Sequence, residues 1–158
     1  MVELLNQIFS AFDELAEKHR LEKIKTIGDA YMVVGGIPEP RTDHADAIAE
    51  MALDMQVEIM KINQSTQQNF SMRIGINSGE VVAGVIGKKK FIYDLWGDAV
   101  NTASRMESHG IANMIHVTDE TYQLLAGKYV FTDRGMIEVK GKGEMQTYIL
   151  QHRLNIIT

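Results

Sequence analysis

Cysteine is absent from the 158-residue chain, which excludes disulfides and thiolate metal sites. No apolar run approaches the roughly 18 residues that a membrane-spanning helix needs. The N-terminus also lacks a basic segment followed by an apolar one, so no secretory leader is predicted. We therefore expect a cytoplasmic location, with membrane contact only through a longer parent protein.

An excess of positive charge is missing too, because 21 Asp and Glu residues outnumber 16 Lys and Arg, giving a net charge of −5. We therefore expect no nucleic-acid partner, although a local basic pocket for a phosphorylated small molecule is compatible with this charge. The 45% hydrophobic and 23% charged content is typical of a globular protein. The length of the chain suits one domain over residues 1–158 with a single hydrophobic core.

Several common catalytic motifs are missing as well. The five histidines occur singly, without a pair at metal-ligand spacing, so zinc chemistry has no support. No serine stands in a nucleophile elbow. Neither a Walker loop nor a dinucleotide fingerprint is present, because the glycines at 35–36 and 141–143 lack the required spacing.

Apolar periodicity and turn residues predict an alternation of helices and hairpins. Helices are expected over residues 2–20, 43–63, 98–108 and 119–125, with Asp43 or Thr42 as the N-cap of the second. Hairpins are expected for 23–27 with 30–34, around Gly28-Asp29, and for 70–76 with 81–86. Further strands are expected at 115–117, 129–132, 136–139 and 146–151. This mixture favours an α+β fold.

Asp29 follows Gly28 at the mouth of the first predicted hairpin, where a carboxylate can project into a cleft and meet a hard divalent cation. Lys25 lies four residues earlier, so strand alternation places Lys25, Ile27 and Asp29 on one face if no bulge intervenes. Gly-Asp is also a common turn, and an exposed strand lysine is usually solvated. From these residues alone, both a metal site and an ordinary solvent-exposed turn are possible interpretations.

Asn101 and Arg105 stand four apart on a predicted helix, so both project from one face. Together they can hold a ribose and a polyphosphate, because a guanidinium has forked donors that match phosphate oxygens. Lys140 and Lys142 lie beside glycines that allow close approach to a phosphate. An exposed helix face and a solvated turn would show the same residues, and the three lysines at 88–90 are typical of a solvated loop.

Four longer segments stand in a characteristic order: KIKTIGDAYM at 23–32, RIGINSG at 73–79, YDLWGDAVNTASRM at 93–106 and VKGKG at 139–143. In this order they resemble the class III adenylyl and guanylyl cyclases, over nearly the whole chain. The resemblance implies a ferredoxin-like α+β catalytic core that works as a head-to-tail homodimer, with residues of both chains in each active site. It also implies regulatory domains in the parent chain.

The resemblance implies a role for each matching residue. Asp29 is expected to be one of two metal-binding aspartates, which hold two Mg²⁺ or Mn²⁺ ions in a complete site. Asn101 is expected to orient the ribose. Arg105 and Lys140 are expected to stabilise the charge that develops on the phosphates.

Lys25 and Asp94 match the pair that reads the purine edge in this family. A lysine can donate to an adenine ring nitrogen and an aspartate can accept from the exocyclic amino group, whereas guanylyl cyclases use a glutamate and a small polar residue. The resemblance thus implies an adenylyl cyclase that converts ATP to 3′,5′-cyclic AMP and pyrophosphate. Two alternatives stay open: a guanylyl cyclase, and a non-catalytic cyclase-like module that binds nucleotide or regulates a partner.

One departure from the family pattern concerns the N-terminus. The family begins its domain with a strand that ends in the first metal aspartate, followed by a phosphate-binding turn, whereas this chain starts in the helix after them. We therefore expect the 158-residue chain to be N-terminally truncated and weakly active or inactive by itself, with a competent enzyme as its parent.

Overall fold

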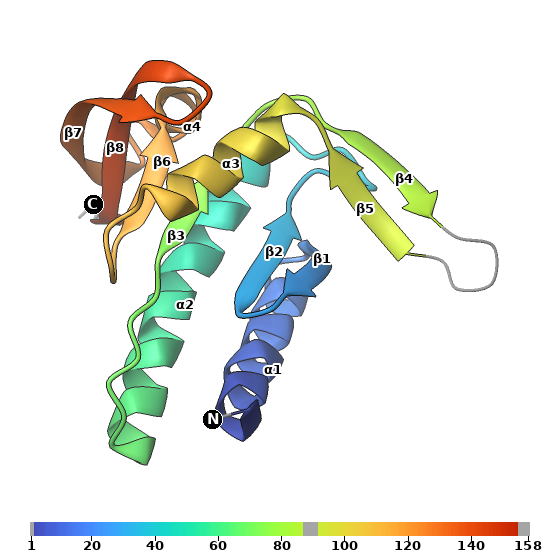
Figure 1. The fold of residues 1–158 in the computed structure, drawn as a ribbon, viewed down its shortest axis with the longest axis vertical. Helices are drawn as coiled ribbons and strands as arrows, with labels where there is room; N and C mark the ends of the chain where they lie inside the picture. Colours follow the sequence, from blue (N-terminus) through green and yellow to red (C-terminus); the bar gives the residue numbers. More distant parts are fainter. Residues whose placement is uncertain (1, 87–91, 155–158) are drawn as a thin grey trace, which may run out of the picture. The chain divides into compact units, whose positions relative to one another are not determined.

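The computed structural model describes residues 2–86 and 92–154 (Figure 1). These residues form two compact units. The first unit lies within Met1–Ser71 and Ala83–Leu95, and the second within Met72–Val82 and Trp96–Thr158. Helices alternate with mostly antiparallel strands, which confirms the predicted α+β class. Within the described ranges, no helix is both long and apolar enough to cross a bilayer.

The first unit begins with α1 (Val2–Lys18), followed by the hairpin of β1 (Glu22–Ile27) and β2 (Ala30–Val34) (Figure 1). The predicted helix and hairpin are both confirmed, and the strands pair antiparallel up to the turn. Gly28 in this turn has φ = 58°, a left-handed conformation that glycine adopts without strain. The buried face of α1 follows the predicted three- and four-residue spacing and contains Ile8, Phe12, Leu15 and Ala16.

The second helix of this unit, α2 (His44–Thr66), is confirmed, but its ends differ from the prediction. Asp43 precedes it, yet its side chain makes no cap hydrogen bond. The carboxylate of Asp43 instead accepts two bonds from the Arg41 guanidinium, at 2.7 and 3.0 Å, and this pairing lowers the pKa of Asp43. The helix also continues past Asn63, whose side chain bonds the backbone N–H and carbonyl of Phe70.

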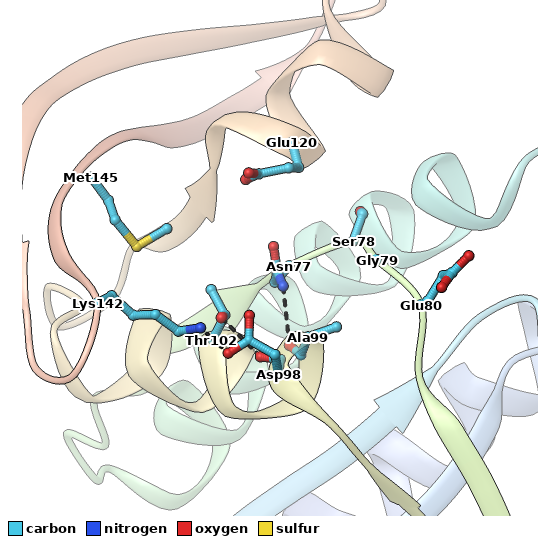
Figure 2. A pocket seen from close by; sticks show the side chains of 10 residues that line it. All are labelled: Asn77, Ser78, Gly79, Glu80, Asp98, Ala99, Thr102, Glu120, Lys142 and Met145. Atoms are coloured by element: carbon cyan, nitrogen blue, oxygen red, sulfur yellow. Dashed lines mark hydrogen bonds and ion pairs between the residues drawn. The ribbon is translucent and has the colours of Figure 1, made fainter.

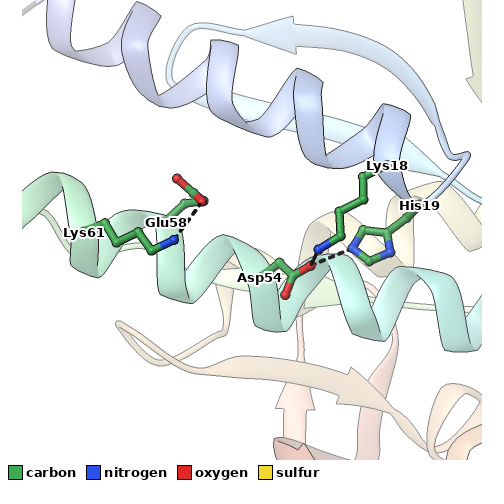
Figure 3. A network of polar contacts seen from close by, with 5 residues as sticks. All are labelled: Lys18, His19, Asp54, Glu58 and Lys61. Atoms are coloured by element: carbon green, nitrogen blue, oxygen red, sulfur yellow. Dashed lines mark hydrogen bonds and ion pairs between the residues drawn. The ribbon is translucent and has the colours of Figure 1, made fainter.

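A polar network joins the end of α1 to α2 (Figure 3). Asp54 Oδ2 on α2 accepts a hydrogen bond from Lys18 Nζ at 3.1 Å. The same oxygen lies 2.7 Å from His19 Nε2. Burial acts to raise the pKa of Asp54, but the bonds from His19 and Lys18 outweigh it and leave the pKa lowered. Lys61 and Glu58 form a separate, more exposed pair on α2 at 3.7 Å.

Among the described residues, the second unit contains β3 (Ile74–Ile76), α3 (Asp98–Ser108), β6 (Ile115–Thr118), α4 (Asp119–Leu125), β7 (Tyr129–Val139) and β8 (Gly143–Arg153). The sheet order is β3-β6-β8-β7, with β3 parallel to β6 and the other neighbours antiparallel. The predicted helices 98–108 and 119–125 are confirmed as α3 and α4. α3 packs on β3, the strand at one edge of the sheet.

The predicted hairpin of 70–76 with 81–86 is wrong. β3 pairs with β6, which is distant in sequence, and β4 (Val82–Ile86) pairs with β5 (Ile92–Trp96) in a separate two-stranded sheet (Figure 1). Residues 77–80 therefore link two sheets instead of closing a hairpin. Residues 77–80 have the composition of a turn, which indicates that the chain changes direction there. That composition does not indicate which strand pairs with β3.

The two strands predicted at 129–132 and 136–139 are parts of one long strand, β7. The register shifts between Asp133 and Gly135, where Gly135 has φ = 87°. This irregularity lets the strand continue past the glycine that separated the two predicted segments.

Candidate functional site

Two of the candidate residues lie on the β1–β2 hairpin. Asp29 occupies the turn and is exposed, so its carboxylate is open to a ligand from solvent. Lys25 lies on β1, is half-buried and stands opposite Met32 of β2. The strand register shifts between Lys23 and Lys25, so the irregularity precedes Lys25 and the predicted alternation holds from Lys25 to Ile27.

A polar contact that the sequence did not indicate holds this hairpin on α1. Tyr31 Oη on β2 donates to Asp13 Oδ1 on α1 at 2.8 Å, and Lys23 Nζ lies 3.1 Å from the same oxygen. The Tyr31 ring also contacts Phe9 and Phe12, with centroids 5.6 and 5.5 Å away. Burial, reinforced by the bond to Asp13, raises the pKa of Tyr31, so its hydroxyl stays a donor. The hairpin is thereby fixed to the helix.

Asp94 belongs to β5, in the first unit. The placement of its side chain lies outside the described part of the chain, as do residues 88–90. The pairing of Asp94 with Lys25 around a purine therefore stays a prediction.

α3 carries Asn101 and Arg105 one helical turn apart, as their spacing predicts. Asn101 is exposed and Arg105 is half-buried. The first turn of the helix is held by two bonds: Asn101 N donates to the Gly97 carbonyl at 3.2 Å, and Thr102 Oγ1 donates to the Asp98 carbonyl at 2.9 Å. The exposed part of this turn presents the asparagine to solvent.

Lys140 and Lys142 lie in the tight turn between β7 and β8. Gly141 and Gly143 have φ = 81° and 80°, which explains why glycines flank Lys142. The side chain of Lys140 is exposed, while its backbone N–H donates to His109 Nε2 at the end of α3, at 3.3 Å.

A second contact joins the same turn to the other end of α3. Lys142 Nζ donates to the carboxylate of Asp98, the first residue of α3 (Figure 2). On β7, Arg134 Nη1 donates to the His109 carbonyl at 2.6 Å. The structure thus places the Lys140 turn beside the helix that carries the candidate asparagine and arginine.

A cleft of about 270 Å³ lies in the second unit, at the start of α3 (Figure 2). Asn77 Nδ2 donates to the Ala99 carbonyl at 3.0 Å, and its Oδ1 accepts from Thr118 Oγ1 at 2.7 Å, so its amide orientation is set. Sequence reasoning missed this cleft because it treated residues 77–80 as a hairpin turn. Polar side chains of the lining include Asn77, Ser78, Glu80, Asp98, Glu120 and Lys142.

The candidate residues fall in both units. The first unit contains Lys25, Asp29 and Asp94, and the second contains Asn101, Arg105 and Lys140. Of the second set, the structure brings the turn of Lys140 against α3.

Asp29 is the metal-ligand candidate. Mg²⁺ is commonly held by one or two carboxylates together with substrate phosphates and water, and an exposed turn carboxylate fits that pattern. Within residues 2–86 and 92–154, no three or more His, Asp or Glu side chains gather where they could hold a metal ion. Asp29 therefore fits as one ligand of a cation whose remaining ligands come from elsewhere, such as a bound polyphosphate.

The family model of the adenylate and guanylate cyclase catalytic domain matches residues 1–152. The chain belongs to this family. Members of the family use divalent metal ions for catalysis. The predicted family and fold are therefore confirmed.

The cyclase domain resembles relatives named for both nucleotides. It is 49% identical over 150 residues to an adenylate cyclase of Mycobacterium tuberculosis, covering 95% of this chain and 34% of that protein. It is 46% identical to the human guanylate cyclase soluble subunit beta-2, covering 98% of this chain and 25% of that protein. Sequence identity thus does not separate ATP from GTP as substrate.

Among solved structures, the guanylate cyclase domain of RhGC from Catenaria anguillulae, in complex with GTP, matches with a TM-score of 0.92 and 45% identity. The match covers 98% of this chain and 85% of that one. The chain therefore has the fold of a cyclase catalytic domain. The chain spans about a third or less of the length of the curated relatives that it matches.

Proposed function

We propose that this cyclase domain belongs to an adenylyl cyclase, which converts ATP to 3′,5′-cyclic AMP and pyrophosphate. The proposal of ATP as the substrate depends on the presence of a lysine at position 25 and an aspartate at position 94. Relatives of both specificities are about equally similar, so the choice depends on these positions and not on overall identity.

Lys25 and Asp94 match the hydrogen-bonding edge of adenine. A lysine ammonium only donates and suits an adenine ring nitrogen, whereas an aspartate only accepts and suits the exocyclic amino group. Guanine presents a carbonyl and a protonated ring nitrogen at these places, so the same pair would leave polar groups unpaired. The half-buried position of Lys25 supports this role, because partial burial limits the directions in which its ammonium points.

The reaction forms a bond between the ribose 3′-oxygen and the α-phosphorus and breaks the bond from that phosphorus to pyrophosphate. The 3′-hydroxyl loses its proton, and negative charge builds on the phosphates. Asn101 orients the ribose from the exposed first turn of α3. Arg105 and Lys140 supply fixed positive charge toward the phosphates.

Asp29 would contribute one carboxylate to the divalent-cation site, which by family resemblance holds two Mg²⁺ or Mn²⁺ ions. When bound, the cations lower the pKa of the attacking hydroxyl and neutralise charge on the triphosphate. The role of the protein there is to hold the carboxylate steady at the hairpin turn. The bond from Tyr31 to Asp13 does this by fixing the hairpin on α1.

We also propose that the active unit is a head-to-tail homodimer whose sites use residues of both chains. One chain contains the metal and purine candidates, Asp29 with Lys25 and Asp94, together with the ribose and phosphate candidates on and beside α3. A chain with all of these residues needs no unlike partner to assemble a site.

The test measures cyclic AMP and cyclic GMP formed from ATP and GTP with Mn²⁺. It uses the 158-residue chain and the natural protein that contains it. The proposal expects cyclic AMP from the natural protein. It also expects that Lys25→Glu with Asp94→Ser lowers kcat/KM for ATP by about tenfold to a hundredfold, the range for one or two unpaired buried polar groups, and raises the relative use of GTP.

The ratio of the two products is the control for misfolding, because a folding defect lowers both activities together. A preference for GTP in the unaltered protein would establish the guanylyl cyclase instead. Formation of neither product by a dimeric protein that binds ATP would favour the non-catalytic module.

A further inference from the structure

The turn between β7 and β8 contains two glycines, which limit the backbone less than other residues do. Gly141 and Gly143 stand on either side of Lys142, and both have positive φ, so the turn has two residues without a Cβ to limit the backbone. Inside the turn, Lys142 N donates to the Val139 carbonyl at 2.9 Å. Contacts with other elements restrict such a turn further and so help to present Lys140 in one place.

Those contacts are with the two ends of α3. At the end of the helix, the backbone N–H of Lys140 donates to His109 Nε2. At its beginning, Lys142 Nζ donates to the Asp98 carboxylate (Figure 2). Both contacts join the turn to the helix that carries Asn101, and they come from residues that sequence spacing does not connect.

The ion pair is partly shielded from solvent on the side of the lysine. The side chain of Lys142 is only 23% exposed, although that of Asp98 is 80% exposed. Partial burial of the ammonium reduces screening and limits its rotamers, which strengthens the pair relative to two solvated side chains. Asp98 is also the first residue of α3, where a negative charge interacts favourably with the helix N-terminus.

We propose that Asp98 and Lys142 are positioning residues for the cyclase reaction: their ion pair holds the glycine-flanked turn against α3, so that Lys140 acts together with Asn101 and Arg105. This inference rests on the proposed cyclase function. In this inference Lys142 binds the Asp98 carboxylate and does not bind the phosphates of the substrate. The loss of either partner releases the turn and reduces transition-state stabilisation more than substrate binding.

The experiment uses the natural protein that contains this chain and compares its kcat and KM with those of Asp98→Asn, Lys142→Gln and the double variant. Each single change is expected to lower kcat by about tenfold to a hundredfold, the loss that follows a misplacement of about 1 Å, with a smaller change in KM. The double variant is expected to be no worse than either single one, because the second change removes a contact already lost. Asp98→Glu and Lys142→Arg are expected to retain most of the activity.

Lys61→Gln is the matched control, because Lys61 forms an exposed ion pair with Glu58 on α2 and has no assigned role. Its kcat is expected to stay unchanged. Asp98→Asn also removes the favourable interaction of the aspartate with the N-terminus of α3. This loss does not depend on Lys142, so it cancels when the effect of Asp98→Asn is compared in the presence and absence of Lys142.

Two kinetic results would overturn the inference. If Lys142→Gln raises KM while Asp98→Asn has no effect, Lys142 binds phosphate directly. Additive losses in the double variant would show that the two residues act separately.

A second readout separates this inference from the proposed function. Amide hydrogen exchange of residues 140–143 is expected to be faster in Asp98→Asn than in the unaltered protein, whatever reaction the protein catalyses. If the unaltered protein forms no cyclic nucleotide but the turn exchanges faster, the proposed function fails and the positioning contact stands. Unchanged exchange in the variant would refute the contact itself.

Discussion

Gly75 on β3 is the place where α3 packs closest to the sheet. An added Cβ would lie 2.1 Å from Glu107 N, 2.6 Å from Met106 C and 2.7 Å from Ala103 O, all of them backbone atoms. A backbone atom cannot rotate away as a flexible side chain can. Gly75→Ala must therefore move α3 outward by about 0.9 Å before the shortest contact reaches 3.0 Å, below which Cβ contacts are essentially never seen.

This displacement has consequences for stability and for catalysis. Overpacking of a well-filled interior costs about 1–3 kcal/mol, which for a chain of this size lowers Tm by about 2–12 °C. Because α3 carries Asn101 and Arg105, the same movement displaces both side chains from the substrate. A shift of this size is expected to lower kcat by up to about a hundredfold.

Thermal unfolding of the Gly75→Ala chain and steady-state kinetics of the natural protein with the same change test both effects. Gly79→Ala is the matched control, because its added Cβ would meet only the Ala99 side chain, at 3.2 Å. The control is expected to unfold within a few degrees of the unaltered protein. An unchanged Tm and an unchanged kcat in Gly75→Ala would refute the close packing of α3 on β3.

Two further predictions concern stability. Burial lowers the pKa of His116 against the opposing effect of its bond to the Met106 carbonyl, and the charges of Arg134 and His109 lower it further. The unfolded chain therefore binds more protons below the ordinary value of 6.5, so the free energy of unfolding should fall as the pH falls through that value. Urea unfolding on either side of pH 6.5 should show a weaker pH dependence in His116→Gln, and an equal dependence would contradict the assignment. Tyr31→Phe removes the bond to Asp13 and should cost about 1 kcal/mol in urea unfolding, whereas unchanged stability would show that the bond does not hold the hairpin.

Local patterns in the sequence predicted the elements whose structure depends on nearby residues. α1, the β1–β2 hairpin, α3 and α4 were all predicted, because helical periodicity and a Gly-Asp turn depend on neighbours within a few residues. The predicted hairpin of 70–76 with 81–86 failed for the opposite reason. β3 pairs with β6, and its partner lies beyond two strands and a helix in the sequence.

The candidate site likewise contains features that depend on nearby residues and features that depend on residues distant in the sequence. The spacing of Asn101 and Arg105 placed them on one helical face, and the structure agrees. The contact of Lys142 with Asp98 joins residues 44 positions apart, so spacing could not indicate it. The purine pair depends on family resemblance alone, because no local rule relates Lys25 to Asp94.

The most direct test of the central claim is the cyclic nucleotide formed by the unaltered natural protein when ATP and GTP compete at equal concentration with Mn²⁺. The proposed pairing of Lys25 and Asp94 with adenine predicts cyclic AMP as the main product. Cyclic GMP as the main product would contradict that pairing and the adenylyl cyclase assignment with it.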